Sequence, residues 1–368
     1  MPLSTKSVVI SGYYGFDNLG DEAILEQLCH ELREIDPGIK ICVLSQNPES
    51  TSKKYDVESI SRWSVTAIYN ALSACDLFIS GGGGLFQDSS SIKSVVYYAF
   101  LFFLARLKRV PIFVYAQGIG PLRSSISHFL TKASMSLAAC ICVRDKKSQL
   151  ILKRWNLDSY LTADPVWALS TNVDSKDNCD TNRGAVADPD KKLKIGLSLR
   201  QCDVLDESWL ETISSQLKKS LPPKCILVPL VLQESLDKPV LDILIKSLDN
   251  FEIEQINLKP DDLPSLWLSS ISKLDMMVAM RLHAAIMALK SGVATLALAY
   301  DPKVATVAKD FAQPYIEMKN PDSKKIFESK LLELLENTKE LEQKAKKTAS
   351  DKEKDARQNK ELLAKFLK

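Results

Sequence analysis

The sequence lacks the features that mark several large classes of protein. Its 48 basic and 46 acidic side chains leave a formal net charge of only +2, without the strong basic excess of dedicated nucleic-acid binders. Its longest apolar run, Val95 to Ala105, is shorter than the roughly 20 residues that span a bilayer. The start, Met-Pro-Leu-Ser-Thr-Lys, lacks the charged region and cleavage site of a signal peptide. We therefore expect a cytoplasmic protein that binds no nucleic acid, while docking of the Val95–Ala105 face on a membrane surface stays open.

Metal-binding and disulfide patterns are also missing. The eight cysteines are scattered, with no CxxC pair and no Cys/His cluster at zinc-ligand spacing. Cys140 and Cys142 stand in an apolar run, which favours buried, reduced thiols over a disulfide framework. We predict no metal site. Of the three histidines, His30 and His128 fall inside helical stretches, which leaves His283 as the one of chemical interest.

What the sequence does contain is a regular alternation of apolar strand candidates with helical stretches. Hydrophobic residues make up 45% of its 368 residues, enough for two domains. The strand candidates are near-continuous apolar runs, which is typical of parallel sheets covered on both faces. We predict two doubly wound α/β domains facing a cleft, with ligands beyond the carboxyl ends of the strands. The predicted parts are an N-terminal domain (1–170), a linker or long loop (171–192), a C-terminal domain (193–322) and a helical tail (323–368).

The bounds of the predicted strands follow the apolar runs. They are Ser7–Gly12, Lys40–Ser45, Asp76–Ser80, Pro111–Ala116, Cys140–Val143 and Ser159–Thr162 in the first half, and Leu193–Leu199, Cys225–Val231, Glu252–Ile256, Leu274–Met280 and Thr295–Tyr300 in the second.

Glycine-rich segments follow three of the strands. The first runs from Ser11 to Ala23, and its Asp21 is placed to cap a helix expected at 22–33. The second is the run Gly81–Gly84, and the third is Gln117-Gly-Ile-Gly-Pro. They match neither the dinucleotide fingerprint GxGxxG nor the Walker A loop. Since ordered glycines cost conformational entropy, we expect the Gly81–Gly84 backbone to lie against a ligand or a neighbouring segment, with exposed N–H groups that bind an anion or a hydroxyl.

The most specific pattern is Met280-Arg-Leu-His, at the end of the strand Leu274–Met280. Arg281 offers a planar fork for a carboxylate or phosphate, and His283 can transfer a proton near neutral pH. Lys303 follows the next strand candidate, so the three side chains converge if the two strands are neighbours. Arg200, after the first strand of this domain, is placed to join them.

Two further polar pairs follow strands of the first domain. Arg144 and Asp145 close the strand Cys140–Val143, and both an ion pair and a ligand contact stay open for them. Asp164-Pro165 occupies a comparable position and has the composition of a turn.

Taken in order, Gly-Tyr-Tyr-Gly-Phe-Asp-Asn-Leu-Gly-Asp-Glu-Ala-Ile, Ser-Gly-Gly-Gly-Gly-Leu-Phe-Gln-Asp, Gln-Gly-Ile-Gly-Pro and Met-Arg-Leu-His resemble the polysaccharide pyruvyl transferases, in particular the CsaB-like subgroup. The resemblance extends from about Val8 to Phe311. It implies a GT-B-like fold of two Rossmann-like domains. It also implies transfer of a pyruvyl group from phosphoenolpyruvate to a sugar as a ketal, with phosphoenolpyruvate as a co-substrate and no cofactor.

The resemblance also assigns roles. The donor-binding residues match Arg144, Arg281, His283 and Lys303, by motif for Arg281 and His283 and by position for the other two. We expect His283, with Arg281, to act in catalysis and Arg200 to assist in donor binding. The acceptor sugar is expected to face the first domain, at Gly15, Asp17, Asp21, Gly82, Gly83 and Asp88. A lipid-linked acceptor at the inner face of the membrane is a further expectation from the resemblance.

Two other functions stay open. GT-B folds commonly serve glycosyltransferases that use a nucleotide-sugar donor, and a fold does not fix a function. A non-catalytic anion or saccharide sensor is the third alternative. The acceptor sugar, the carboxylate that serves as base, and the oligomeric state are not determined by the sequence.

Overall fold

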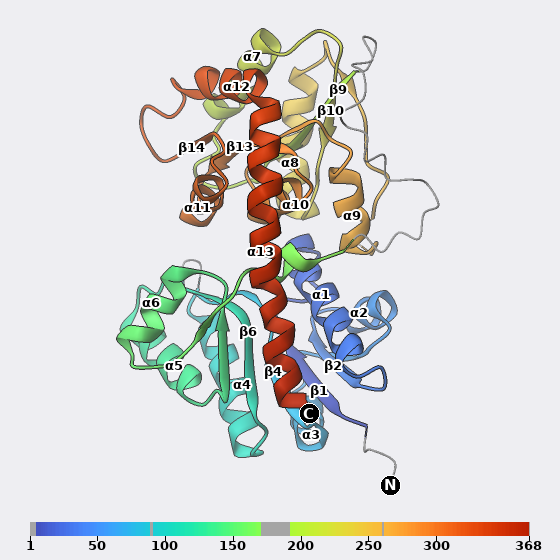
Figure 1. Ribbon diagram of the computed structural model, residues 1–368, viewed down its shortest axis with the longest axis vertical. Coiled ribbons are helices and arrows are strands. Elements are labelled where there is room, and N and C mark those ends of the chain that lie inside the picture. The colour runs from blue at the N-terminus through green and yellow to red at the C-terminus, as the bar shows by residue number, and fades with distance from the viewer. Residues whose placement is uncertain (1–4, 89–90, 171–191, 260, 368) are drawn as a thin grey trace. The chain divides into compact units, whose positions relative to one another are not determined.

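The computed structural model describes residues 5–88, 91–170, 192–259 and 261–367. The chain forms two compact units, unit 1 from Met1–Leu169 with Asp351–Lys368, and unit 2 from Ser170–Ser350. Each unit has a sheet flanked by helices (Figure 1). The predicted linker at 171–192 lies outside the described residues, except for Lys192.

Unit 1 is built on a parallel sheet with the strand order β3-β2-β1-β4-β6-β7-β8, and β5 pairs with β6. The order reverses between β1 and β4, as in a Rossmann fold, and the carboxyl ends of these two strands flank the switch point. The strands are β1 (Ser7–Ser11), β2 (Lys40–Ser45), β3 (Glu58–Ser61), β4 (Leu77–Ser80), β5 (Gly83–Phe86), β6 (Ile112–Ile119), β7 (Cys140–Val143) and β8 (Tyr160–Leu161).

Helices connect these strands, and their apolar faces close the core of unit 1. Phe78, Phe86 and Phe102 pack edge to face between the sheet and a helix, an arrangement that the ring quadrupoles favour. The helices are α1 (Leu19–Ile35), α2 (Pro48–Tyr55), α3 (Val65–Ala74), α4 (Lys93–Leu107), α5 (Ser125–Ser136), α6 (Lys146–Arg154) and the 3₁₀ turn η1 (Pro165–Ala168).

Unit 2 repeats the same plan. Its sheet has the parallel order β11-β10-β9-β12-β13-β14, with the switch point between β9 and β12. Its strands are β9 (Leu193–Ser198), β10 (Cys225–Pro229), β11 (Glu252–Ile253), β12 (Met276–Ala279), β13 (Ala294–Ala299) and β14 (Tyr315–Glu317). Its helices are α7 (Glu207–Ser220), α8 (Glu234–Ser247), α9 (Pro264–Ile271), α10 (Leu282–Lys290), α11 (Pro302–Asp310) and α12 (Phe327–Glu336).

The C-terminal segment, expected as one helical tail from 323, is divided. Helix α12 buries Phe327, Leu331 and Leu334 in the core of unit 2. The long helix α13 (Thr338–Leu367) begins in unit 2 and ends in unit 1. In unit 1, the amide of Asn359 on α13 donates to the carbonyl of Ala163, and its Oδ1 accepts from Thr162.

The predicted strands lie within about three residues of the observed ones, but some short elements were missed. These are α2, the edge strand β3, the strand β5 inside the glycine-rich run, and β14. Among the described residues, no helix is long and apolar enough to cross a membrane. The seven cysteines of the described residues are all free, and Cys179 lies outside this part of the chain.

Candidate active site

The carboxyl edge of the sheet of unit 2 gathers the predicted donor-binding residues. Strands β12 and β13 pair in parallel, with Ala279 opposite Ala297, so the neighbour relationship that the prediction required is present. Arg281 and His283 follow β12, and Lys303 follows β13. Strand β9, which precedes Arg200, pairs with β12 on its other side. Three adjacent strands therefore deliver these four residues to one edge of one sheet.

Arg281 is buried and ion-paired. Its Nε donates to both carboxylate oxygens of Asp237, at 2.9 and 3.1 Å, and its Nη2 donates to Oδ1 of Asp237. The same Nη2 donates to Gln233 at 3.1 Å. Asp237 is fully buried and also accepts from the backbone amides of Leu232 and Gln233, each at 2.9 Å. Asp237, which the sequence analysis did not single out, therefore fixes the orientation of the guanidinium.

His283 and Lys303 occupy equivalent places in successive helices. His283 is the second residue of α10 and Lys303 is the second residue of α11, and both are half-buried. Asp301 caps α11 by accepting from the backbone amide of Lys303 at 2.8 Å. The first turn of a helix carries partial positive charge, so both side chains stand where an anion is favoured.

Arg200, which follows β9, contacts Tyr300, which follows β13. Its Nη1 donates to the hydroxyl of Tyr300 at 2.9 Å, and its guanidinium carbon lies 5.5 Å from the centre of the Tyr300 ring. Two polar atoms at or just after the end of β9 are buried and have no hydrogen-bond partner among the described residues. They are Nε of Arg200 and Oγ of Ser198, the last residue of β9. Because buried polar atoms are almost always paired, these two atoms indicate a place where a ligand or water binds.

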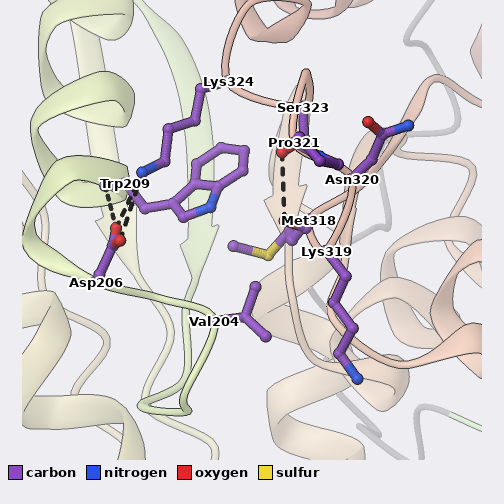
Figure 2. Close-up of a pocket in the computed structure, with 9 residues that line it drawn as sticks. All are labelled: Val204, Asp206, Trp209, Met318, Lys319, Asn320, Pro321, Ser323 and Lys324. Carbon is purple, nitrogen blue, oxygen red and sulfur yellow. Dashed lines mark hydrogen bonds and ion pairs between the residues drawn. The ribbon is translucent and has the colours of Figure 1, made fainter.

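Unit 2 also has an open pocket of about 350 Å³ (Figure 2). It is formed by residues that follow β9 and β14, among them Trp209, Lys319 and Asn320. Lys324 reaches the carboxylate of Asp206 at 3.2 Å beside the indole of Trp209 (Figure 2). None of the predicted donor-binding residues lines this pocket.

Arg144, in unit 1, is held in a second buried ion pair. Its Nη1 donates to Asp164 at 2.5 Å, and the two side chains are 8% and 5% exposed. Gly118 lets the guanidinium lie over the backbone, because a Cβ atom there would stand 2.9 Å from Nε of Arg144. Asp145, for which both an ion pair and a ligand contact had stayed open, caps α6 by accepting from the amide of Ser148. Asp164, predicted as part of a turn, is both the ion-pair partner and the cap of η1.

The glycine loops of unit 1 close around one buried side chain, Tyr14. A Cβ atom on Gly12 would overlap the Tyr14 ring, and one on Gly81 would overlap its hydroxyl oxygen. The amide of Gly81 donates to the carbonyl of Ser11 at 2.7 Å. The expectation of an exposed N–H group is therefore wrong for Gly81, because its N–H is hydrogen-bonded and Tyr14 fills the space beside it.

The remaining predicted glycines are also tightly packed. Gly15 (φ +74°) donates to Glu22, and a Cβ atom there would overlap Ser45. Gly82 lies against Ile24, and Gly83 (φ +94°), which belongs to β5, has Asp21 2.9 Å from the position of a Cβ atom. A close approach of backbone to protein accounts for these glycines.

The three predicted acceptor-side carboxylates differ in their surroundings. Helix α1 begins at Leu19, so Asp21 lies inside its first turn and accepts from the side chain of Asn18 rather than capping the helix. Asp88 accepts from the backbone amides of Arg123 and Ser124 and so ties its own loop to the start of α5. Asp17 is exposed and has a left-handed backbone (φ +54°), a conformation that is uncommon outside glycine.

The chain matches one protein family in sequence and resembles several solved proteins in structure. The family model for polysaccharide pyruvyl transferase matches residues 18–302, while no curated protein matches the sequence. The structure is similar to HepE from Anabaena in complex with UDP and glucose, at 12% identity with a TM-score of 0.61, covering 98% of this chain and 99% of that one. It is also similar to the UDP-GlcNAc 2-epimerase from Neisseria meningitidis bound to UDP-GlcNAc, at 14% identity with a TM-score of 0.63, covering 99% of each chain. These likenesses show a GT-B-like fold.

Proposed function

The chain belongs to the polysaccharide pyruvyl transferase family, and we propose that it moves a pyruvyl group from phosphoenolpyruvate to a sugar. The sugar belongs to a cell-wall or exopolysaccharide precursor, the product is a ketal, and phosphate is released. The observation that carries the proposal is the gathering of Arg200, Arg281, His283 and Lys303 on adjacent β9, β12 and β13. The narrower resemblance to the CsaB-like subgroup stays a prediction from the motifs.

Phosphoenolpyruvate carries a carboxylate and a phosphate, so its site needs several cations. Guanidinium groups suit the planar oxygens of both, and the first turns of α10 and α11 add positive potential. The unpartnered Nε of Arg200 supports binding of an anion at the switch point. We assign Arg200, Arg281 and Lys303 to donor binding. For Arg144 the same role stays a prediction from the resemblance.

The proposed reaction has two stages, and His283 acts in the first. His283 gives a proton to the methylene carbon of phosphoenolpyruvate, which becomes a methyl group and leaves an oxocarbenium-like centre. One sugar hydroxyl attacks this centre, and the C–O bond to phosphate breaks. A second hydroxyl then closes the ketal ring. The proton of the attacking hydroxyl passes to a carboxylate base and from it, through water, back to His283. The proton of the second hydroxyl goes to phosphate, so the sum is one ketal and one phosphate, with no cofactor.

Asp17 is the carboxylate best suited to accept a proton from the attacking hydroxyl. It is exposed on the loop that follows β1, whereas Asp21 and Asp88 are engaged by Asn18 and by backbone amides. A general base needs room for the hydroxyl that it deprotonates. Asp17 therefore enters the proposal as the base, and Asp21 and Asp88 as residues that shape the acceptor loops.

The test is to incubate the full chain with phosphoenolpyruvate and a panel of aryl and lipid-linked sugars, and to measure phosphate release and ketal formation by mass spectrometry. Lys303→Ala is expected to raise the KM for phosphoenolpyruvate. Lys319→Ala removes a cation that lines the open pocket of unit 2 and is expected to leave this KM unchanged.

The alternative is a glycosyltransferase with a nucleotide-sugar donor, which the likeness to UDP-bound structures favours at the level of the fold. Turnover of nucleotide sugars, with none of phosphoenolpyruvate across the panel, decides for this alternative. Binding of phosphoenolpyruvate or sugar without any turnover decides for a sensor.

A further inference from the structure

Helix α4 presents a continuous apolar stripe to solvent. Val96, Phe100, Phe103 and Leu107 are spaced by three or four residues, which places them on one face of the helix. They are 49%, 40%, 45% and 74% exposed. The opposite face of the same helix buries Val95, Leu101 and Phe102 in the core. The helix is therefore apolar all round although only one side is covered by unit 1.

The neighbouring helices extend this surface. α4 packs against α5 on one side and α3 on the other. On α3, Val65 and Tyr69 are exposed one turn apart, and on α5 Ile126 and Phe129 are exposed. Single exposed apolar residues are normal, but a contiguous patch marks an interaction surface. We call the exposed apolar residues of α3, α4 and α5 the apolar face.

Helices α4 and α5 and the segment between them carry charges of one sign. No acidic residue occurs between Asp88 and Asp145. Apart from Arg144, which is ion-paired with Asp164, the exposed or half-buried cations of this segment are Lys93, Arg106, Lys108, Arg109, Arg123 and Lys132. Helix α3 contains no acidic residue either. Among the described residues, none of these six cations forms an ion pair, although Lys108 lies 3.2 Å from the centre of the Tyr69 ring. The whole chain is nearly neutral, so this concentration of cations is local.

The apolar face continues toward the carboxyl edge of the unit 1 sheet through an aromatic cluster. Trp63, which follows β3, is 62% exposed and lies 5.5 Å from the ring of Tyr97 on α4. The buried Arg62 stands 4.4 Å from Tyr97 and 5.0 Å from Phe16, and Tyr13 stacks on Phe16. Tyr13 and Phe16 belong to the loop that precedes Asp17. The apolar face thus reaches the loop expected to hold the acceptor sugar.

We propose that the apolar face docks unit 1 on the surface of an anionic lipid bilayer. Exposed aromatic and aliphatic side chains enter the boundary between headgroups and acyl chains, and the surrounding cations contact anionic headgroups. A second copy of the chain is a poorer occupant, because a self-complementary pairing brings the same unpaired cations together. The proposal goes beyond the pyruvyl transfer proposed above and gives a lipid-linked acceptor a direct route to the loop after β1.

Flotation of the full chain with vesicles tests the proposal. The chain is expected to bind vesicles of phosphatidylcholine with phosphatidylglycerol, and to bind vesicles of phosphatidylcholine alone far more weakly. Phe100→Ser with Phe103→Ser is expected to reduce binding by about tenfold or more. Lys108→Glu with Arg109→Glu is expected to reduce it by a similar factor, and salt is expected to weaken the natural protein in the same way.

Control variants in unit 2 make single changes of the same kinds, apolar to serine and lysine to glutamate. Ile243, 56% exposed on α8, becomes Ser, and the exposed Lys347 of α13 becomes Glu; both variants are expected to bind vesicles as the natural protein does. Circular dichroism verifies that each variant is folded.

Three results overturn the proposal: no binding to anionic vesicles, equal binding by the Phe100/Phe103 variant, or self-association through the apolar face that excludes lipid. Pyruvyl transfer to a water-soluble aryl sugar is expected to be unchanged in the Phe100/Phe103 variant. Failure of vesicle binding and failure of the proposed reaction are therefore separate observations.

Discussion

Arg281 donates from both Nε and Nη2 to the fully buried carboxylate of Asp237, 44 residues earlier in the chain. The arginine expected to hold the anion of the substrate thus already neutralises a charge of the protein. A loss of activity on removing Arg281 has two explanations, namely lost donor binding and a disturbed fold. These explanations are separable. Removing the buried carboxylate as well relieves a disturbed fold, but it does not restore lost donor binding.

We predict that Asp237→Ala lowers the free energy of unfolding by about 3–5 kcal/mol, because it leaves Arg281 charged and buried without its partner. Arg281→Met alone is expected to cost a similar amount. Combining Arg281→Met with Asp237→Leu restores most of the stability, since an apolar pair can replace a buried ion pair. Urea unfolding gives the free energies. Pyruvyl transfer is expected to stay absent in the stable double variant, and its return would remove Arg281 from the donor site.

His283→Gln is predicted to lower kcat by about 100-fold or more, the range in which general acid catalysis contributes. The KM for phosphoenolpyruvate is expected to change less, because the cations that bind the donor remain. His283 is half-buried at the start of α10, so the unfolding midpoint should stay close to that of the natural protein. His128→Gln, on α5 of unit 1, is the matched control. Unchanged kcat in His283→Gln contradicts the proposed proton transfer.

The sequence predicted where the expected donor-binding residues lie on the sheet, but not which side chains contact them. Strands β9, β12 and β13 are almost entirely buried apolar runs, and parallel strands bring their carboxyl ends to one edge, so Arg200, Arg281 and Lys303 were placed by chain order alone. Nothing in the spacing links Arg281 to Asp237 on α8. Such pairs are set by packing of side chains from separate elements, which a periodicity does not encode.

The elements that the sequence missed have the same explanation. The strand β5 begins with Gly83 and Gly84, residues that strands usually avoid. It forms because β6 offers pairing partners, Gln117 opposite Gly83 and Ile119 opposite Phe86. The polar edge strand β3 and the polar helix α2 carry weak apolar patterns for a similar reason, since much of their surface faces solvent. Tertiary contacts decide such elements.

The contact between Gly81 and Tyr14 makes a sharp test of the unit 1 switch point. Gly81→Ala is predicted to lower the free energy of unfolding by about 1–3 kcal/mol or more, because its methyl group overlaps the Tyr14 hydroxyl. Tyr14→Phe removes that oxygen, which is buried without a hydrogen-bond partner among the described residues, so it is expected to be neutral or stabilising. In the Tyr14→Phe background, Gly81→Ala should cost about 1 kcal/mol less.

Gly12→Ala is the control for this cycle. Its methyl group overlaps carbon atoms of the Tyr14 ring, which phenylalanine keeps, so Tyr14→Phe should relieve it far less. Denaturant unfolding of the single and double variants measures both couplings. If Tyr14→Phe relieves Gly81→Ala and Gly12→Ala equally, the Tyr14 hydroxyl is not the group that the methyl group of Gly81→Ala overlaps.

Glu31 gives the chain a predicted pH dependence. Burial raises the pKa of this α1 carboxyl to about 7, although hydrogen bonds from Gln27 (2.9 Å) and Tyr115 (2.7 Å) act in the opposite direction. Since the folded state holds this proton more tightly than the unfolded state, the associated stability is fully present below about pH 4.5 and is lost as the pH rises through about 7. The loss reaches up to about 3 kcal/mol.

Glu31→Gln should remove this dependence, because the amide is neutral throughout and can hydrogen-bond with a flipped Gln27, whose Oε1 has no partner among the described residues. We therefore expect the difference in free energy of unfolding, natural protein minus variant, to fall steadily between about pH 5 and about pH 8. Urea unfolding across this range measures it. Glu34 on the same helix has its pKa lowered by the hydrogen bond from Lys360, so its titration ends below this window and Glu34→Gln should leave the slope unchanged. A parallel pH profile for the natural protein and Glu31→Gln would mean that Glu31 ionises normally in the folded protein.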